Sequence, residues 1–307
     1  MPIKHPIIIF YRSYTMSNVK SNAKLFHLPV TPYPYYNYLN FLIPNPTGRN
    51  MRNIKLRIEY EGTNYCGWQI QPECETIQGV LESTLSKITK ADTDVIGAGR
   101  TDAGVHALGQ IANFRTDSRM TPDEFKSALN SLLPKDIVIK YVEEVDDSFH
   151  ARYDAINRIY HYTILNSNTP SAFLRNFVYV NYHSIDVELM NTACEFLIGT
   201  HDFSSFGSAS DPVRSTVRNI THARWYVFDS QCSVIDEGCR HHLIQLRLEA
   251  NAFLRGMVRT ISGTLLEVGL GKIVPEKVKD ILDIKDRPSA GPSLPAKGLC
   301  LVRVEYR

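Results

Sequence analysis

From residue 51 onward, apolar and polar positions follow regular periods that predict strands and helices. Alternation over 54–60 is typical of a half-buried strand, whereas apolar residues over 77–88 recur at helical spacing. The same reasoning, with a capping box that begins at Thr121, predicts the other elements of the first half: a strand over 94–98, a strand over 105–114, a helix from 121 and a strand over 137–145. This order of strand, helix, strand, strand, helix, strand is ferredoxin-like.

The second half of the chain repeats this outline. Asp186 is a suitable N-cap for a helix, and apolar residues over 254–268 form a long helical stripe. The elements expected here are a strand over 158–165, a helix over 186–198, strands over 217–228 and 242–250, a helix over 254–268, a shorter helix from Pro275 and a strand over 299–306. The polar segment 146–154 separates the halves. We therefore expect an α+β protein with domains over 51–150 and 151–307, and a cleft between them.

Residues 1–50 differ from the rest because they show no sustained period. They contain five basic residues and no acidic residue, a charge of +5, so the remaining 29 basic residues (34 minus 5) and 32 acidic residues give the body a charge of −3. Because the net charge of the body would not attract a polyanion, a polyanion would have to bind to a local patch of Lys and Arg. We interpret 1–50 as an irregular or disordered basic leader. Translation from Met51 is the preferred explanation, ahead of a disordered segment and a targeting segment.

Length and composition indicate a globular protein of about two domains. No apolar run approaches the roughly 18 residues of a membrane span. The six cysteines include no C-x-x-C pair and none at metal-ligand spacing with histidine, which favours free thiols in a reducing compartment. We therefore expect a cytoplasmic protein that uses neither a membrane anchor nor a metal ion.

The segment Gly97-Ala-Gly-Arg-Thr-Asp-Ala-Gly-Val-His106 is the most informative motif. Its three glycines let the backbone turn where side chains would obstruct it, and Arg100 and Asp102 lie between them. Such a loop can present a carboxylate beside a counter-ion that stabilises its charge, although Asp beside Gly is also a common turn former. On this loop alone both interpretations stay open. No second carboxylate stands at suitable spacing, which argues against a two-carboxylate glycosidase and a metal site.

Two further groups of residues contain arginine in a pattern that suits nucleic acid. On one predicted strand, Arg158, Tyr160 and Tyr162 share a face, which fits a stacked base beside a phosphate and equally fits a solvated sheet face. Arg255 and Arg259 are four residues apart and would lie together on the last long helix. There they would grip a phosphate or face solvent.

Together and in this order, these motifs resemble the TruA family of tRNA pseudouridine synthases. The matches extend over most of Met51 to Tyr306, and the loop from Gly99 to His106 is the most specific of them. The matching segments are Tyr65-x-Gly67-Trp68-Gln69, Thr76-Ile-Gln78-Gly79-x-Leu81-Glu82, Gly99-Arg-Thr-Asp-Ala-Gly-Val-His106, Phe149-His-Ala-Arg152, Arg158-x-Tyr160-x-Tyr162, Asp202-Phe-x-Ser-Phe206, Asn251-Ala-Phe-Leu-x-x-Met257-Val-Arg259 and Gly298-Leu-x-Leu301-Val302.

The resemblance implies an isomerase that converts uridine to pseudouridine at positions 38, 39 and 40 in the anticodon stem-loop of tRNAs. It also implies two ferredoxin-like halves that share a continuous antiparallel sheet, with helices on one side and a central RNA-binding cleft. Family members pair as homodimers and need no metal and no organic cofactor. The expected partners are therefore tRNA and a second copy of the chain.

By motif position, Asp102 resembles the catalytic carboxylate, Arg100 its ion-pair partner, Tyr160 the residue stacked on the target base, and Leu301 an apolar wall of the pocket. Asp102 would act as a nucleophile at C1′ of the ribose or as a base at C2′, and both roles are open. The Tyr160 hydroxyl is a candidate to help remove the C5 proton. The basic residues expected to contact phosphates without reading sequence are Arg152, Arg158, Arg255 and Arg259.

Two other functions also fit the sequence. The first is a related synthase that modifies different uridines. The second is an RNA-binding or tRNA-folding protein that keeps the fold without turnover, against which the presence of Arg100, Asp102 and Tyr160 argues.

Overall fold

The computed structural model describes residues 51–208, 215–229 and 242–307. The prediction of a basic leader concerns residues 1–50 and so lies outside the described residues. Residues Arg49–Arg307 form one compact unit, within which a single ten-stranded sheet is the main feature. The two predicted halves are therefore not separate compact units, and the boundary near residue 150 stays an interpretation of the topology.

The first half contains the six elements that the hydrophobic pattern predicts. In chain order they are β1 (Arg52–Tyr60), α2 (Ile77–Thr89), β2 (Val95–Gly97), β3 (His106–Thr116), α3 (Pro122–Leu132) and β4 (Ile137–Val145). A short 3-10 helix, η1 (Gly62–Asn64), follows β1. Strand β1 lies between β4 and β3, and β2 pairs with the far end of β3, all antiparallel. The strand order is thus β4-β1-β3-β2.

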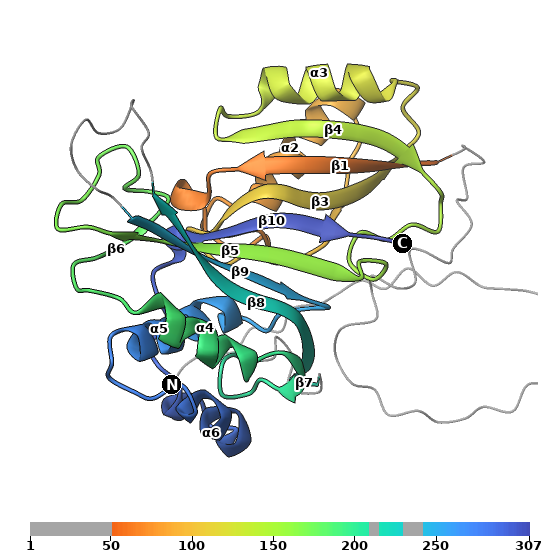
Figure 1. Cartoon of the computed structure of the whole chain (residues 1–307). Coiled ribbons are helices and arrows are strands. Elements are labelled where there is room, and N and C mark those ends of the chain that lie inside the picture. Colours follow the sequence, from red (N-terminus) through yellow and green to blue (C-terminus); the bar gives the residue numbers. More distant parts are fainter. Residues whose placement is uncertain (1–50, 209–214, 230–241) are drawn as a thin grey trace, which may run out of the picture. The chain divides into compact units, whose positions relative to one another are not determined.

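The second half contains the predicted elements and two more strands. The predicted ones are β5 (Asn157–Asn166), α4 (Val187–Glu195), β8 (Val217–Asp229), β9 (His242–Ala250), α5 (Met257–Gly269), α6 (Lys277–Ile284) and β10 (Leu299–Glu305). The additional strands, β6 (Tyr179–Asn181) and β7 (Gly199–Asp202), pair with β5 and β8. Two 3-10 helices, η2 (Arg287–Ser289) and η3 (Ala296–Gly298), precede β10. The strand order here is β10-β5-β9-β8-β7, and β10 lies next to β3, so the two halves form one sheet (Figure 1).

The prediction of an α+β protein is confirmed, but the sheet is mixed rather than antiparallel. Strand β10 runs parallel to β3 where the two halves meet, and β6 runs parallel to β5. The junction between β3 and β10 is short, because only Cys300 and Leu301 pair with His106 and Ala107. Strands that a hairpin connects are antiparallel. The β3–β10 pair can be parallel because β10, the last strand of the chain, is far from β3 in the sequence.

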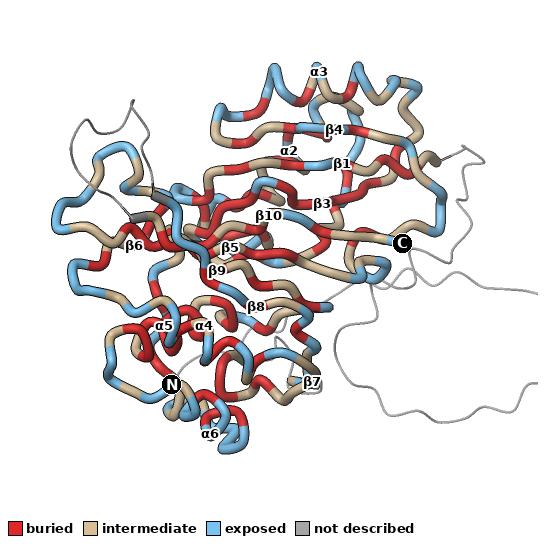
Figure 2. Tube along the Cα trace, viewed as in Figure 1, coloured by how far each residue is buried: buried red, intermediate tan, exposed pale blue. Residues whose placement is uncertain are grey.

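Figure 2 shows buried positions along the strands of both halves. The helices of both halves cover the same face of the sheet, as the identity of the buried residues indicates. Directly paired residues of neighbouring strands project from the same face. A row of such residues crosses five strands, and all of its members are buried: Tyr60, Ala107, Leu301, Tyr160 and Leu248. One end of this row packs against Trp68, shortly before α2, and Tyr160 packs against Phe253, shortly before α5. The middle of the row therefore lies between the helices of the two halves.

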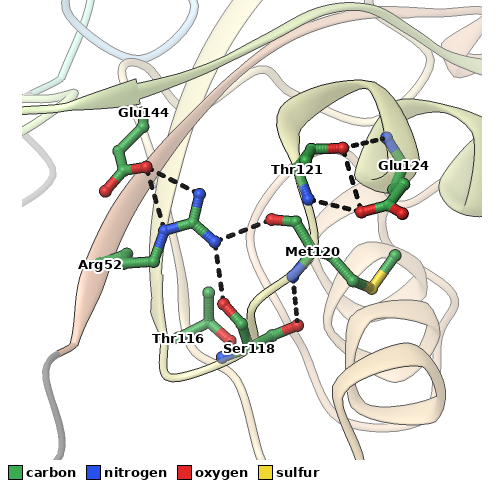
Figure 3. Close-up of polar contacts among 7 residues, drawn as sticks. All are labelled: Arg52, Thr116, Ser118, Met120, Thr121, Glu124 and Glu144. Atoms are coloured by element: carbon green, nitrogen blue, oxygen red, sulfur yellow. Dashed lines mark hydrogen bonds and ion pairs between the residues drawn. The ribbon is translucent and has the colours of Figure 1, made fainter.

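The predicted capping box at the start of α3 is present (Figure 3). Thr121 Oγ1 accepts a hydrogen bond from the Glu124 backbone N–H at 3.3 Å, and Glu124 accepts one from the Thr121 N–H at 2.7 Å. The hydrogen bonds that the Thr121 N–H and the Thr121 hydroxyl donate to Glu124 Oε2 hold the pKa of the Glu124 carboxyl below its usual value. Beside the cap, Arg52 of β1 donates to Glu144 of β4 and to carbonyls of the turn that leads into α3. The helix start is thus tied to the edge of the sheet.

Replacement of Thr121 by Ala is expected to lower the free energy of unfolding by about 1 kcal/mol, because the Glu124 backbone N–H loses its acceptor, Thr121 Oγ1. Urea unfolding followed by circular dichroism measures this change. Ser127→Ala is the matched control, since Ser127 is exposed on the same helix and should change stability by less than about 0.5 kcal/mol. Equal effects of the two substitutions would contradict the capping interpretation.

Candidate active site

The loop that carries Asp102 is fixed by backbone hydrogen bonds along its length. At its start, Ala98 N–H donates to Ile111 of β3 at 2.7 Å. In its middle, the Trp68 N–H donates to the Thr101 carbonyl at 3.0 Å, and near its end the Gly104 N–H donates to the Tyr65 carbonyl at 3.3 Å. The Asp102 backbone is therefore held from both sides.

Side chains of the sheet support the same loop. The Tyr60 hydroxyl and Thr101 Oγ1 are hydrogen-bonded at 2.8 Å. Gln110 Nε2 donates to the Gly99 carbonyl at 2.8 Å, and Arg158 Nη2 donates to the Ala98 carbonyl at 3.1 Å. Tyr60, Thr101 and Gln110 are all buried. The sequence analysis did not identify Tyr60 or Gln110, although the alternation of β1 places Tyr60 with the core and so offered a signal for it.

Gly67 permits the closest approach to this loop. Its φ is +91°, and an added Cβ would lie 2.5 Å from the Thr101 carbonyl oxygen and 2.9 Å from the Asp102 carbonyl carbon. Both the backbone conformation and the lack of space therefore favour glycine. The next residue, Trp68, is buried against Tyr60, with ring centroids 6.2 Å apart. Together they form a rigid wall beside the Asp102 loop.

The Asp102 carboxylate is partly accessible and lies between two arginines of the second half of the chain. Its side chain is 29% exposed. Arg259 Nη1 lies 3.7 Å from Oδ2, and Arg255 Nε lies 3.8 Å from Oδ1. The predicted pairing of Asp102 with Arg100 is therefore corrected: Arg100 is exposed and forms no ion pair or hydrogen bond within the described part of the chain. Thr101 between them is fixed in the core, and Arg100 is left facing solvent.

The two arginines reach Asp102 from different local structures. Helix α5 begins at Met257, with Gly256 as its N-cap at φ +72°. Arg255 therefore precedes the helix, contrary to the expectation that it shares a helix face with Arg259. The Arg255 side chain is 77% exposed, whereas Arg259 is mostly buried and donates from Nε to the Leu294 carbonyl at 2.6 Å. Arg259 is thus a partner of Asp102 that the Leu294 carbonyl also holds, and Arg255 is an exposed one.

Tyr160 lies in the buried row of the sheet, directly paired with Leu301. Its ring meets Phe253 edge to face, with centroids 5.1 Å apart. Burial is the main cause that raises the pKa of the Tyr160 phenol; the positive charge of Arg158 opposes this, and the Asp102 carboxylate adds to it. The phenol is therefore neutral at neutral pH. Leu301 is fully buried, so it supports Tyr160 as an apolar neighbour.

The two other arginines predicted to contact phosphate differ in their surroundings. Arg152 is half-buried, and its guanidinium lies over the Tyr153 ring at 5.8 Å. Arg158 directs its guanidinium to backbone carbonyl groups, one of which is that of Ala98. The structure therefore brings Asp102, Tyr160, Arg255 and Arg259 together and turns Arg158 toward the backbone.

The described residues contain no cluster of three or more His, Cys, Asp or Glu side chains arranged to hold a metal ion. None of the helices that are described is long and apolar enough to cross a membrane.

Comparison with known proteins identifies the class of protein that this fold and site define. A family model described as tRNA pseudouridine synthase matches residues 57–154 and 193–307. tRNA pseudouridine synthase A 2 of Clostridium perfringens is 46% identical over 256 residues, which are 83% of this chain and all of the relative. The tRNA pseudouridine synthase A proteins of Caldicellulosiruptor bescii and Acetivibrio thermocellus are each 45% identical over the same shares.

The chain belongs to the tRNA pseudouridine synthase family, within which its curated relatives are of the TruA type. It is therefore an isomerase that acts on tRNA, as the sequence motifs implied.

Gly67→Ala is expected to reduce turnover by about 100-fold, because a shift of the Asp102 loop by about 1 Å has an effect of that size. Single-turnover conversion of uridine in a tRNA transcript measures the change. Gly271→Ala is the matched control, since Gly271 has a similar φ of +71° but nothing within 4 Å of an added Cβ. If both variants lost the same activity, backbone strain and not loop displacement would be responsible.

Proposed function

We propose that this synthase forms pseudouridine at positions 38, 39 and 40 of the tRNA anticodon stem-loop, with Asp102 as the catalytic carboxylate. The specific motifs around Gly99–His106 and the names of the relatives support this proposal. The observation that carries it is the geometry of Asp102: a carboxylate on a rigid loop, between Arg255 and Arg259 and electrostatically coupled to Tyr160.

The reaction rearranges bonds without net gain or loss of atoms. The N1–C1′ bond breaks, the base turns, C5 joins C1′, and the proton on C5 is transferred so that N1 ends protonated. The target uridine must first leave its stack, at a cost of a few kcal/mol. Asp102 acts on the ribose as a nucleophile at C1′ or as a base at C2′, and its partial exposure allows either approach.

Tyr160 is proposed to stack on the freed uracil. A neutral aromatic ring supplies a stacking face to any base, and the buried row beneath it, including Leu301, keeps the ring in place. The Tyr160 hydroxyl has no hydrogen-bond partner within the described residues. It is therefore available to relay the C5 proton, which gives Tyr160 a catalytic as well as a binding role.

The exposed cations around Asp102 are proposed to bind the RNA backbone. Arg100 stands two residues before Asp102 and is exposed, and the exposed Arg255 contacts Asp102. The Arg152 carbonyl accepts a hydrogen bond from Arg158, which also contacts the loop of Asp102. Such residues position RNA without reading its sequence. Arg259 is mostly buried, so we propose that it stabilises the negative charge of Asp102. It would contact a phosphate only when the carboxylate interacts with the substrate.

We further propose that the enzyme is a cytoplasmic homodimer with a central cleft for RNA between its halves. Four cysteines of the described chain are free, which suits a reducing compartment. The sheet face away from the helices exposes Tyr141 and Tyr226, and aromatic residues of this kind are enriched in interfaces. Analytical ultracentrifugation tests the dimer.

Asp102→Asn is expected to reduce conversion of uridine in an unmodified tRNA transcript to less than about one thousandth of the original rate. tRNA affinity should change little, because the substitution keeps the shape of the side chain. The assay is run with a chelator, and modified positions are mapped afterwards. Survival of activity would reject the role of Asp102. Modification at other uridines would favour a synthase of different specificity, and RNA binding without turnover in the unmutated protein would favour a folding protein.

Arg255→Ala is expected to weaken tRNA binding and to reduce the slope of log affinity against log salt by about 0.7 to 0.9, the effect of one phosphate contact. Filter binding over a series of salt concentrations measures both quantities. Arg119→Ala is the control, because Arg119 is exposed in the turn before α3 and outside the site. An unchanged slope in Arg255→Ala would contradict the phosphate contact.

A further inference from the structure

The guanidinium of Arg158 lies where three backbone segments meet, and it donates to four of their carbonyls. Nη2 donates to the carbonyls of Ala98 at 3.1 Å and Arg152 at 2.9 Å. Nη1 donates to the carbonyls of Ala155 at 2.9 Å and Asn251 at 2.6 Å. The four acceptors come from regions of the sequence up to 153 residues apart (251 minus 98). Asn251 follows Ala250, which pairs with Arg158 between β5 and β9, so this one side chain connects the Ala98 loop to the end of that strand pair.

All the partners of this cation are neutral. Within the described residues Arg158 forms no ion pair with a carboxylate, and its partial burial lowers the pKa of the guanidinium. A buried charge without a counter-ion is costly unless hydrogen bonds satisfy it. The planar guanidinium fork directs its donors to several acceptors at once, which the three donors of a lysine ammonium cannot reproduce. The arrangement is therefore specific for arginine.

The connected segments are those that build the site. Ala98 begins the loop of Asp102, and Asn251 begins the segment that leads to Arg255 and α5. We infer that Arg158 is a positioning residue, which sets the distance between the Asp102 loop and the segment of Arg255 instead of binding an RNA phosphate. This inference rests on the proposed role of Asp102.

Other hydrogen bonds also hold the Asp102 loop, so the loss of Arg158 would not release the loop completely. Gln110 holds the Gly99 carbonyl, and the Tyr60 hydroxyl contacts Thr101. These contacts come from β1 and β3 and do not depend on Arg158. Without the guanidinium, the loop would thus keep its attachment to the first half, and only the long contacts of Asp102 with Arg255 and Arg259 would connect it to the second. A displaced carboxylate is the expected result, rather than an unfolded chain.

The test compares Arg158→Ala with the unmutated enzyme on an unmodified tRNA transcript. The single-turnover rate at saturating tRNA is expected to fall by about 100-fold, as for other displacements of about 1 Å. The dissociation constant for tRNA and its dependence on salt should stay the same. Added guanidinium chloride at concentrations that do not unfold the protein should restore turnover in a dose-dependent way, because the free ion can occupy the vacated place.

Arg255→Ala is the matched control for a phosphate contact: it should alter the salt dependence of binding and show no rescue by guanidinium. If Arg158→Ala instead weakened binding, reduced the salt slope and kept the saturated rate, Arg158 would be a phosphate ligand and the inference would be overturned. Absence of guanidinium rescue in a folded Arg158→Ala protein would also overturn it.

A second variant covers the case in which Arg158→Ala does not fold. Arg158→Lys keeps the charge and the aliphatic stem, and it should lower the saturated rate without changing the salt slope. If neither variant folds, the guanidinium supports the whole fold and the positioning inference fails. Full activity of Asp102→Asn would instead remove the proposed role of Asp102, and the rescue experiment tells these two failures apart.

Discussion

The contacts of the Asp102 carboxylate with Arg255, just before α5, and Arg259, in its first turn, depend on how the two halves of the sheet are joined. Asp102 belongs to the first half, and Arg255 and Arg259 to the second. They meet because β10 inserts between β3 and β5, with only two paired positions on the β3 side. The N–O distances of 3.7 and 3.8 Å are longer than those of tight charge-assisted hydrogen bonds. A substrate can therefore replace these contacts without breaking a strong bond.

Around this loose ion pair, the backbone is held tightly. The loop is attached through Ala98, Gly99, Thr101 and Gly104 to the sheet and to the segment around Gly67. Enzymes stabilise developing charge best with groups that are already oriented. The fixed backbone and the partly exposed carboxylate together provide such an orientation for the role proposed for Asp102.

The sequence predicted most helices and strands because their apolar periods are long. It missed β6 and β7, which have three and four residues. A period does not show over so few residues, and β2, which is as short, was predicted only because it leads into the glycine loop. The motif order also pointed to Asp102 and Tyr160, which the structure brings close together. The partner of Asp102 could not be deduced, because proximity in sequence favoured Arg100, whereas the observed partners lie more than 150 residues further along the chain. For the same reason, the pattern of β5 could not distinguish a phosphate-binding Arg158 from one directed to the backbone.

The use of main-chain oxygens by Arg158 has an evolutionary consequence. A carbonyl group is present whatever side chain stands at Ala98, Arg152, Ala155 or Asn251, so those positions can drift without removing an acceptor. Only the donor depends on residue identity. Constraint from these four hydrogen bonds therefore falls on the codon for the arginine alone. Any constraint on the acceptor positions must come from other contacts, such as the hydrogen bond that the Asn251 side chain accepts from the Asn219 N–H.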